Sequence, residues 1–330
     1  MSDRLLVKNL LEVNNLHTSF FVEEGEAKAV DGISFSVPES ESVGLVGESG
    51  SGKTMTALSI LGLVARPGRI VSGEILFESR KGRVDLTKIK EEELRQIRGG
   101  EISMIFQEPF TALNPVFTVE YQIQESVGLH LGLSGKQAKQ KVLEVLSDVG
   151  IKDAARIAGS YPHELSGGLR QRAMIAMALV SSPKLLIADE PTTALDVTVQ
   201  TQILDLLAEI KERMKLSLIM VSHDLGVISR VCDTVNIMYA GRLVEKASKK
   251  DLFKNPLHPY TEGLLGSVPS IEKIEKRLRS IPGSVPSPLS LPLGCKFHPR
   301  CTKVMDICKR EEPADRIIGN RCIRCWLYNK

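Results

Sequence analysis

The sequence predicts an α/β fold whose central sheet is mainly parallel. Short apolar runs alternate with helical patterns from residue 12 to about residue 245, and this alternation is typical of a parallel sheet covered by helices. A glycine-rich turn joins one of these apolar runs to a helical pattern. The 330 residues, of which 42% are hydrophobic and 25% charged, have the composition of an ordinary globular protein with one large domain or two smaller ones.

Three apolar runs are predicted to be buried strands. They lie at residues 42–46, 185–188 and 216–221, and the first leads through the glycine-rich turn into a helix that starts at Lys53. Between the last two runs, apolar residues recur at the spacing of one helix face: Ile203, Leu207, Ile210 and Met214.

A helical insertion and a separate C-terminal lobe interrupt this rhythm. Residues of about 112–180 look mainly helical, with clear patterns at 136–150 and 169–181. Beyond residue 250, prolines at 256, 259, 269, 282, 286, 288 and 292 preclude long regular elements. We therefore expect one domain at residues 1–250 and a small lobe at 251–330.

Charge and cysteine content restrict the class of protein. The formal net charge is only +3, too small to indicate nucleic acid as the main partner, although residues 271–330 hold 13 Lys and Arg against 6 Asp and Glu. No apolar run has the length of a signal peptide or a membrane span, so we expect a cytoplasmic protein with reduced thiols. Five of the six cysteines lie in the last 36 residues.

The glycine-rich turn matches the phosphate-binding P-loop pattern. Glycines let the backbone curl so that its N–H groups face phosphate oxygens, the lysine supplies a positive charge, and the last hydroxyl is a ligand for Mg²⁺. The strand–turn–helix context also agrees with this pattern. The candidate ATP-binding residues are Gly47, Glu48, Ser49, Gly50, Ser51, Gly52, Lys53 and Thr54.

Two carboxylates end the second predicted strand. A carboxylate at the end of a parallel strand beside a P-loop can hold Mg²⁺, and this position belongs to Asp189. Glu190 follows directly and is placed to polarise an attacking water. These elements alone fit any P-loop nucleoside triphosphatase.

Residues 165–172, Leu-Ser-Gly-Gly-Leu-Arg-Gln-Arg, resemble the signature of ABC ATPases. The other motifs of that family occur along the chain in the family's order. Gln107 is the Q-loop residue and precedes the signature, whereas Asp196 in the D-loop and His223, the switch histidine, come after it. The resemblance covers residues of about 12–245.

The resemblance implies a head-to-tail pair of ATPase subunits. Ser166, Gly167 and Gly168 would face the nucleotide held by the P-loop of the other subunit. The resemblance makes Glu190, His223 and Gln107 catalytic residues and adds Gln107 to Thr54 and Asp189 as Mg²⁺ ligands. Phe20 would stack on adenine, although Phe21 is adjacent and either ring could belong to the core instead.

Four further segments look like those of dipeptide and oligopeptide permease ATPases. They are residues 107–115, 238–242, 255–261 and 294–301. Leu169 occupies a position where most ABC signatures have Gln. At this position the chain resembles the D-type subunit of these permeases. The implied partners are a second, different ATPase subunit, two transmembrane permease subunits and an extracytoplasmic solute-binding protein. The chain would then be peripheral, at the cytoplasmic face of the cell membrane.

Other functions remain open on the sequence. Related permeases import nickel or other small solutes with similar ATPases. A soluble ABC ATPase acting in translation or DNA repair usually has two fused halves or a long coiled-coil insertion, and this chain has neither. A cysteine-dependent redox sensor with a vestigial ATPase would predict a damaged catalytic set, whereas the set is complete. Peptide import is the leading interpretation.

Four C-terminal cysteines form a candidate metal site. Cys295, Cys301, Cys308 and Cys325 are spaced C-x5-C-x6-C-x16-C and match cysteine positions of the permease family, and Cys322 is additional. Because the lobe has only a small hydrophobic core, reduced thiols there favour metal–thiolate bonds that would stabilise its fold. Wide spacings favour a [4Fe–4S] cluster over zinc, which usually shows paired short spacings; free thiols are the third alternative.

Overall fold

The computed structural model describes residues 8–107, 112–193, 195–267 and 281–328. Its central feature is a sheet of eight strands in the order β11-β12-β10-β9-β3-β8-β7-β6. Five strands are parallel, namely β3 (Ser42–Val46), β6 (Ile102–Ile105), β7 (Leu185–Asp189), β8 (Ser217–Ser222) and β9 (Thr234–Tyr239). Three antiparallel strands continue one edge, namely β10 (Arg242–Ser248), β11 (Arg316–Ile318) and β12 (Arg321–Ile323). The predicted α/β fold with a mainly parallel sheet is confirmed.

The three predicted strands are buried on both faces. Leu185 and Ile187 of β7 belong to one hydrophobic core, whereas Leu186 and Ala188 belong to the other. Successive residues of a strand point to opposite faces, so a strand between two cores is apolar throughout. This is why β3, β7 and β8 are visible as continuous apolar runs.

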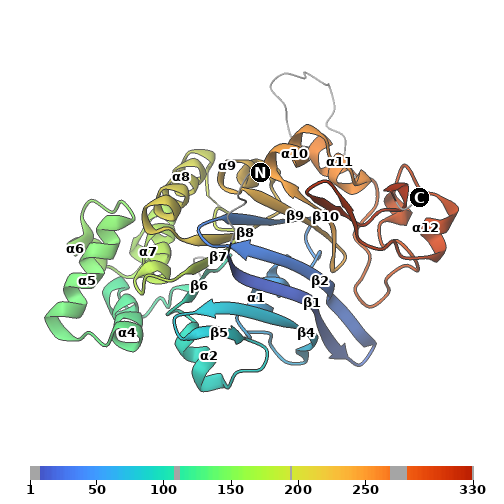
Figure 1. The fold of residues 1–330 in the computed structure, drawn as a ribbon. Coiled ribbons are helices and arrows are strands. Elements are labelled where there is room, and N and C mark those ends of the chain that lie inside the picture. Colours follow the sequence, from blue (N-terminus) through green and yellow to red (C-terminus); the bar gives the residue numbers. More distant parts are fainter. Residues whose placement is uncertain (1–7, 108–111, 194, 268–280, 329–330) are drawn as a thin grey trace, which may run out of the picture.

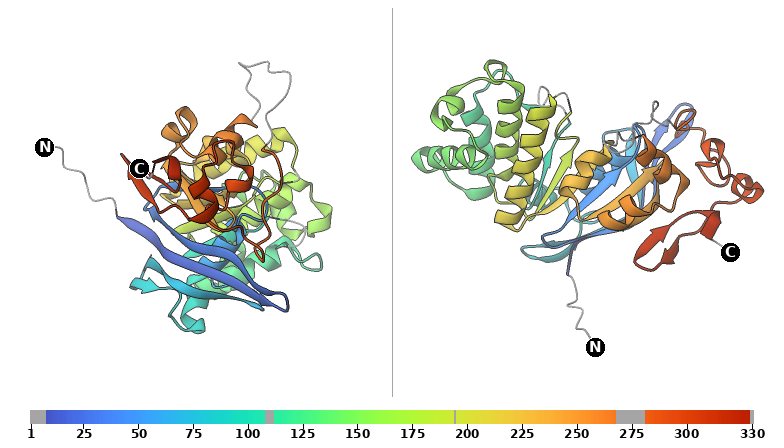
Figure 2. Two further views of the ribbon diagram at one scale, coloured as in Figure 1. Left: turned by 90° about the vertical axis from the view of Figure 1, so that its right-hand side faces the viewer. Right: turned by 90° about the horizontal axis from the view of Figure 1, so that it is seen from above.

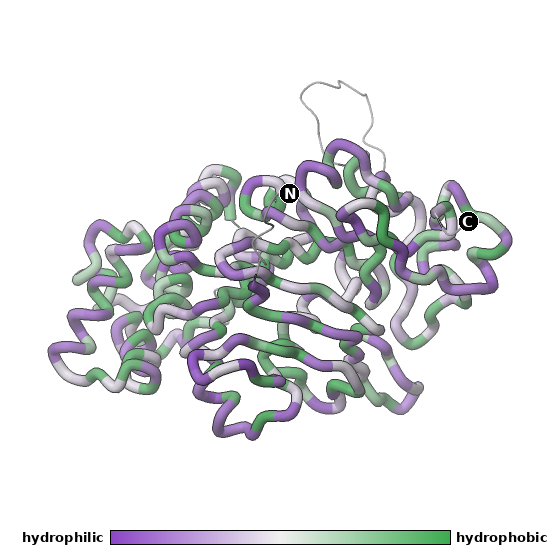
Figure 3. The backbone as a smooth tube through the Cα atoms, in the orientation of Figure 1, coloured by the Kyte–Doolittle hydropathy of each residue, from purple (hydrophilic) through white to green (hydrophobic). Residues whose placement is uncertain are grey.

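A second, antiparallel sheet was not predicted. Its order is β2-β1-β4-β5, with β1 (Asn9–Val22), β2 (Gly25–Pro38), β4 (Gly68–Ser79) and β5 (Gly82–Asp85). These strands alternate between buried and exposed residues, and apolar and polar residues alternate along them in Figure 3. Two-residue turns end at Gly25 and Gly82, whose φ angles are +132° and +116°. Glycines of this kind were the available signal for the two hairpins.

One helix lies between the two sheets. Helix α1 (Lys53–Ile60) follows β3 and contacts β1 and β2 of the antiparallel sheet as well as β7 and β8 of the main sheet. Its residues Ala57 and Ile60 belong to the core that also contains β1, β2 and β4. The P-loop is thereby fixed between two sheets.

The other helices cover the main sheet and its ends. The helical part contains α4 (Val119–Leu131), α5 (Gly135–Asp148), α6 (Ala154–Gly159) and α7 (Gly167–Leu179) and lies at one end of the molecule (Figure 1). The predicted helices at 136–150 and 169–181 correspond to α5 and α7, with ends shifted by one or two residues. Outside this part and the C-terminal lobe lie α2 (Glu91–Ile97), whose buried residues join the core of the antiparallel sheet, and α8 (Val197–Met214), α9 (Leu225–Val231) and α10 (Lys249–Lys254).

The C-terminal lobe lies at the opposite end from the helical part (Figure 2). Its elements are short, namely α11 (Pro259–Gly266), α12 (Asp306–Arg310), β11, β12 and the 3₁₀ helices η2 (His298–Arg300) and η3 (Trp326–Tyr328). Strand β12 pairs with β10, with Lys246 opposite Cys322. The lobe therefore extends the main sheet, while the domain boundary near residue 250 stays a prediction. No helix in the described ranges is both long enough and apolar enough to cross a membrane.

Candidate nucleotide site

The P-loop is held close to two neighbouring strands. A Cβ atom at Gly47 would lie 2.2 Å from the carbonyl oxygen of Met238 in β9, and one at Gly52 would lie 2.3 Å from the carbonyl oxygen of Ala29 in β2. Gly52 also has a φ of +101°. Both positions therefore require glycine, because any side chain would collide with backbone.

Lys53 lies inside the loop. Its side chain is buried, and Nζ donates hydrogen bonds to the carbonyl oxygens of Gly47 at 2.7 Å and Glu48 at 3.0 Å. Burial lowers the pKa of Lys53, against the opposing attraction of Glu190, Asp189 and Glu48. Lys53, the first residue of α1, thus stabilises the curved loop backbone and places a positive charge inside the loop.

Asp189 and Thr54 meet beside this lysine. The Thr54 hydroxyl donates to Asp189 Oδ1 at 3.2 Å, which links the start of α1 to the end of β7. Asp189 is only 2% exposed. Burial, with a further contribution from Glu190, raises the pKa of Asp189 from 3.8 to about 6, although Thr54 and Lys53 oppose the shift.

Glu190 is the centre of a hydrogen-bond network. Its Oε2 accepts from Gln107 Nε2 at 3.1 Å and from the Thr193 hydroxyl at 3.0 Å, and its Oε1 lies 3.0 Å from His223 Nδ1. Gln107, Glu190 and His223 follow β6, β7 and β8, so the ends of three adjacent parallel strands bring them together. Glu190 itself has a φ of +46°.

This network keeps the Glu190 carboxyl ionised. Burial alone would raise its pKa, but the hydrogen bonds from His223 and Thr193 and the charge of Lys53 lower it below the ordinary value. His223 is 61% exposed at its side chain, so this edge of the network is open to solvent. The sequence analysis missed Thr193, which lies in the same short segment as Glu190 and Asp196.

The signature and D-loop residues are next to one another. Ser166 is the N-cap of α7 and accepts a hydrogen bond from Leu169 N at 3.4 Å. A Cβ atom at Gly168 would lie 3.0 Å from Val199 of α8, and Asp196 caps α8 by accepting from Val199 N at 2.9 Å. The structure thus places Ser166, Gly167 and Gly168 against the start of α8, whereas α1 packs on the two sheets. Of the motif segments, residues 108–111 and Ala194 lie outside the described residues.

The two candidate aromatic residues have different surroundings. Phe20 is half-buried in β1, pairs with Ala27 of β2 and contacts Gly68 of β4. Phe21 is exposed, and the guanidinium carbon of Arg69 lies 4.4 Å from the centre of its ring. Phe20 is therefore one strand away from Ala29, which touches the P-loop, and its stacking on adenine stays a prediction.

The four predicted cysteines share one region of the lobe. Burial and then the neighbouring thiols of Cys308, Cys325 and Cys301 raise the pKa of Cys295 to about 12, and burial, Cys301 and Cys308 raise that of Cys325 to about 11. Cys295 N also donates to the Cys308 carbonyl oxygen at 2.8 Å.

Cys322 belongs to different surroundings. Apart from burial, the groups that act on its pKa are Asp315, Arg324 and Lys246, with no other thiol among them. Among the residues that the structure describes, no group of three or more His, Cys, Asp or Glu is arranged to hold a metal ion.

Comparisons with known proteins agree with this site. Residues 30–193 match the family model described as ABC transporter, and residues 244–308 match that of the oligopeptide/dipeptide transporter, C-terminal region. The chain is 50% identical over 326 residues to the oligopeptide transport ATP-binding protein AppD of Bacillus subtilis, covering 98% of each protein. It is 46% identical to a putative peptide import ATP-binding protein of Brucella abortus, covering 98% of this chain and 97% of that protein.

Solved structures show the same fold. The dimeric structure of MJ0796, described as a bacterial ABC transporter cassette, has a TM-score of 0.64 at 26% identity and covers 72% of this chain and 98% of that one. CbiO1 of Clostridium perfringens, part of an ABC transporter complex, has a TM-score of 0.60 at 27% identity and covers 75% of this chain and 91% of that one. The chain belongs to the ATP-binding, ATP-hydrolysing proteins of ABC transporters, in the group that carries the oligopeptide/dipeptide transporter C-terminal region.

Proposed function

We propose that this chain hydrolyses ATP to energise the import of dipeptides or oligopeptides across the cytoplasmic membrane. The observation that carries the ATPase assignment is the Glu190 carboxylate, which Gln107, Thr193 and His223 hold ionised beside Lys53 and Asp189. The match of residues 244–308 and the names of the relatives, which are oligopeptide transport and peptide import proteins, support a peptide as the cargo.

The P-loop would bind the phosphates of ATP. Residues 47–54 supply backbone N–H groups and the Lys53 charge, and Phe20 is the candidate for stacking on adenine. Thr54 and Asp189, already in contact, would hold Mg²⁺ together with Gln107, whose side chain donates to the next carboxylate along the chain, Glu190. Bound Mg²⁺ would neutralise part of the phosphate charge.

Glu190 would act as the general base. An ionised carboxylate can accept a proton from water that attacks the terminal phosphate, and His223 would orient both the carboxylate and the nucleotide. Gln107 and Thr193 fix the Oε2 atom, so the base has one position rather than several. The positive φ of Glu190 supports this, because strained backbone is often kept at functional positions.

Catalysis would require a second ATPase subunit. Ser166, Gly167, Gly168 and Asp196 form one surface at the starts of α7 and α8, and they would face the nucleotide of the partner. Leu169 in the signature supports a heterodimer with a different ATPase subunit. Two transmembrane permease subunits and a solute-binding protein outside the membrane complete the proposed importer, with this chain on the cytoplasmic face.

The cysteine lobe would hold a [4Fe–4S] cluster, with zinc as the alternative. The ligand type fits, because four thiols gather within a lobe of short elements, where neighbouring thiols contribute to the raised pKa values of Cys295, Cys301 and Cys325. Their arrangement is not that of a closed single-ion site, so the proposal rests on the clustering and spacing of Cys295, Cys301, Cys308 and Cys325. The role would be structural, since metal–thiolate bonds can replace a hydrophobic core.

Substitution of the base tests the ATPase assignment. We expect Glu190→Gln to keep ATP binding but to slow hydrolysis about a hundredfold or more, the usual effect of losing a positioned base. Glu209→Gln, an exposed carboxylate on α8, is the matched control and should retain the wild-type rate. Wild-type hydrolysis by Glu190→Gln would refute the assignment.

A transport assay tests the cargo. Cells that lack this chain should lose uptake of labelled oligopeptide, and the wild-type chain but not Glu190→Gln should restore it. Unchanged peptide uptake in the deletion strain would contradict a peptide cargo.

A further inference from the structure

Arg300 reaches from the C-terminal lobe to the P-loop. It lies at the end of η2, directly before Cys301, and its side chain is only 5% exposed. Its guanidinium donates to both carboxylate oxygens of Glu48, from Nη1 to Oε2 at 2.6 Å and from Nη2 to Oε1 at 2.9 Å. This bidentate pair joins residues 252 positions apart, one in the lobe and one in the P-loop.

A second residue of the C-terminal part holds the same glutamate by its backbone. Glu48 N donates to the hydroxyl of Tyr260, a fully buried residue of α11, at 2.9 Å. The Tyr260 ring packs edge-on against Tyr239 at 4.7 Å between centroids and lies 5.3 Å from Phe297. Both the main chain and the side chain of Glu48 are therefore fixed by residues beyond position 250.

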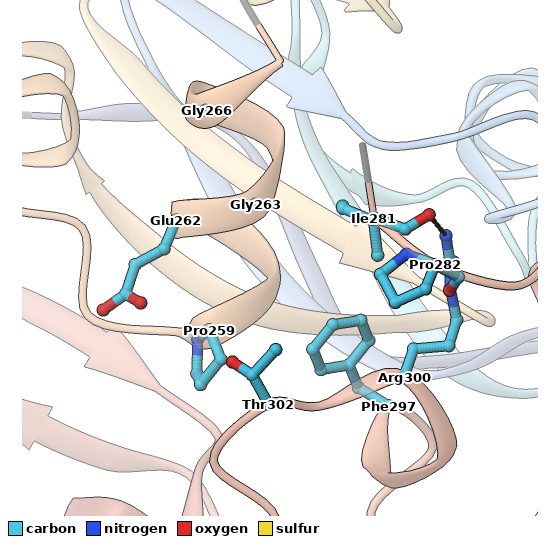
Figure 4. A pocket seen from close by; sticks show the side chains of 9 residues that line it. All are labelled: Pro259, Glu262, Gly263, Gly266, Ile281, Pro282, Phe297, Arg300 and Thr302. Atoms are coloured by element: carbon cyan, nitrogen blue, oxygen red, sulfur yellow. Dashed lines mark hydrogen bonds between the residues drawn. The ribbon is translucent and has the colours of Figure 1, made fainter. Parts of the chain in front are cut away.

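Polar partners determine where the Arg300 side chain lies. Figure 4 shows it beside Ile281 and Pro282. The Ile281 carbonyl oxygen accepts a hydrogen bond from Arg300 Nη2 at 3.4 Å, and the Pro282 carbonyl oxygen accepts one from Arg300 Nε at 2.8 Å. A cavity of about 260 Å³ lies between this side chain and α11. Because that side of Arg300 is not packed, its position depends on these hydrogen bonds and on the lobe backbone that carries it.

The charge of Glu48 makes this contact important for an anionic ligand. Glu48 is close enough to Lys53 to attract its ammonium group electrostatically, and its own carbonyl oxygen accepts from Lys53 at 3.0 Å. An unpaired carboxylate at this place would oppose the binding of a triphosphate and compete for Lys53. The Arg300 guanidinium neutralises it and leaves Lys53 available for phosphate.

We propose that Arg300 is a positioning residue for nucleotide binding, which couples the affinity of the P-loop for ATP to the order of the cysteine-bearing lobe. The inference rests on the proposed ATP site. It gives the C-terminal lobe a role in the nucleotide site of its own chain, carried by the Arg300–Glu48 pair and supported by the Tyr260 contact.

Equilibrium binding of a fluorescent ATP analogue to the full chain tests this. Arg300→Ala should weaken binding about tenfold, because it leaves a carboxylate uncompensated beside the phosphate site. Adding Glu48→Gln to Arg300→Ala should restore most of the lost affinity, because it removes the carboxylate that Arg300 would otherwise neutralise. Arg300→Lys should fall between wild type and Arg300→Ala, since it keeps the charge without the bidentate geometry.

Arg324→Ala is the matched control. Arg324 makes an equivalent bidentate pair in the same lobe, with Asp315 at 2.6 and 2.9 Å, but has no contact with the P-loop among the described interactions. It should leave ATP affinity unchanged. Equal affinity of Arg300→Ala and wild type, or no rescue by Glu48→Gln, would overturn the inference while the proposed function stands. A wild-type chain that binds no ATP would overturn both.

Discussion

At the scale of residues, the neighbouring carboxyls of Asp189 and Glu190 respond to their surroundings in opposite directions. Burial raises the pKa of Asp189 to about 6, whereas the bonds from His223 and Thr193 outweigh burial and lower the pKa of Glu190. The difference arises from the hydrogen-bond partners that the described residues provide: Asp189 accepts from the Thr54 side chain, whereas Glu190 is bonded to the side chains of Gln107, Thr193 and His223. The negative charge of Asp189 is therefore left for a cation to stabilise, whereas the negative charge of Glu190 is already stabilised by its hydrogen-bond partners.

This difference predicts a stability effect of Asp189→Asn. Below pH 3.8 the Asp189 carboxyl is protonated in both folded and unfolded chains and has no differential effect. Between pH 3.8 and about 6 the unfolded chain releases the proton that the folded chain retains, so the fold loses stability as the pH rises through this range. Above that range the penalty is complete, roughly 3 kcal/mol at about 1.4 kcal/mol per pH unit.

Asp189→Asn should therefore unfold at a higher temperature than wild type at pH 7.5 without Mg²⁺ and nucleotide. Melting curves of both proteins from pH 4 to 8 would measure this, and the difference should shrink toward zero at the acid end. Addition of Mg²⁺ and ATP should stabilise only the wild type strongly. A stability difference that does not depend on pH would contradict the assigned burial of this charge.

At the scale of elements, the C-terminal lobe offers a direct test of its proposed cofactor. Protein purified without oxygen should be brown and contain four iron atoms per chain, and Cys308→Ser should lose both properties. Cys322→Ser is the matched control, because Cys322 lies apart from the other thiols, opposite Lys246 of β10. Colourless protein with one zinc ion per chain would exclude the cluster and retain the metal staple.

The elements also explain what the sequence could predict. Strands β3, β7 and β8 are buried on both faces and stand out as apolar runs, and the P-loop has a local pattern because one turn must approach two backbones at Gly47 and Gly52. The antiparallel sheet was missed because its strands are half-exposed. The hydrogen bond from Thr193 to Glu190 joins residues three positions apart, so the sequence alone could have suggested it.

The Arg300–Glu48 pair could not have been predicted in this way. Its partners are 252 residues apart, and neither position has a local pattern that names the other. The pairing of β12 with β10 and the packing of Tyr239, Tyr260 and Phe297 help to bring the lobe to the P-loop, and both are contacts between distant parts of the chain.

At the scale of the whole molecule, the P-loop and the signature residues lie in different parts of the chain, and we propose that each contributes to a different nucleotide site. The P-loop lies between the sheets, and the signature residues lie at the start of α7 beside α8. We expect the purified chain alone to be mostly monomeric and only weakly active, because Leu169 indicates a different natural partner. Light scattering together with ATPase assays checks this, and a stable, fully active homodimer would contradict it.

The pairing of β12 with β10 has a consequence during synthesis. Residues 321–323 emerge from the ribosome well after the strand that they cover, so β10 is at first the open edge of a sheet. Such an edge can pair with the strands of other chains. Glu245 of β10, fully buried in the finished protein, meanwhile lacks its ion-pair partner Arg321. A chain interrupted before residue 321 therefore exposes an unpaired strand edge and leaves Glu245 with the backbone donors of Leu257 and His258 but without its ion-pair partner, features that chaperones and proteases can recognise.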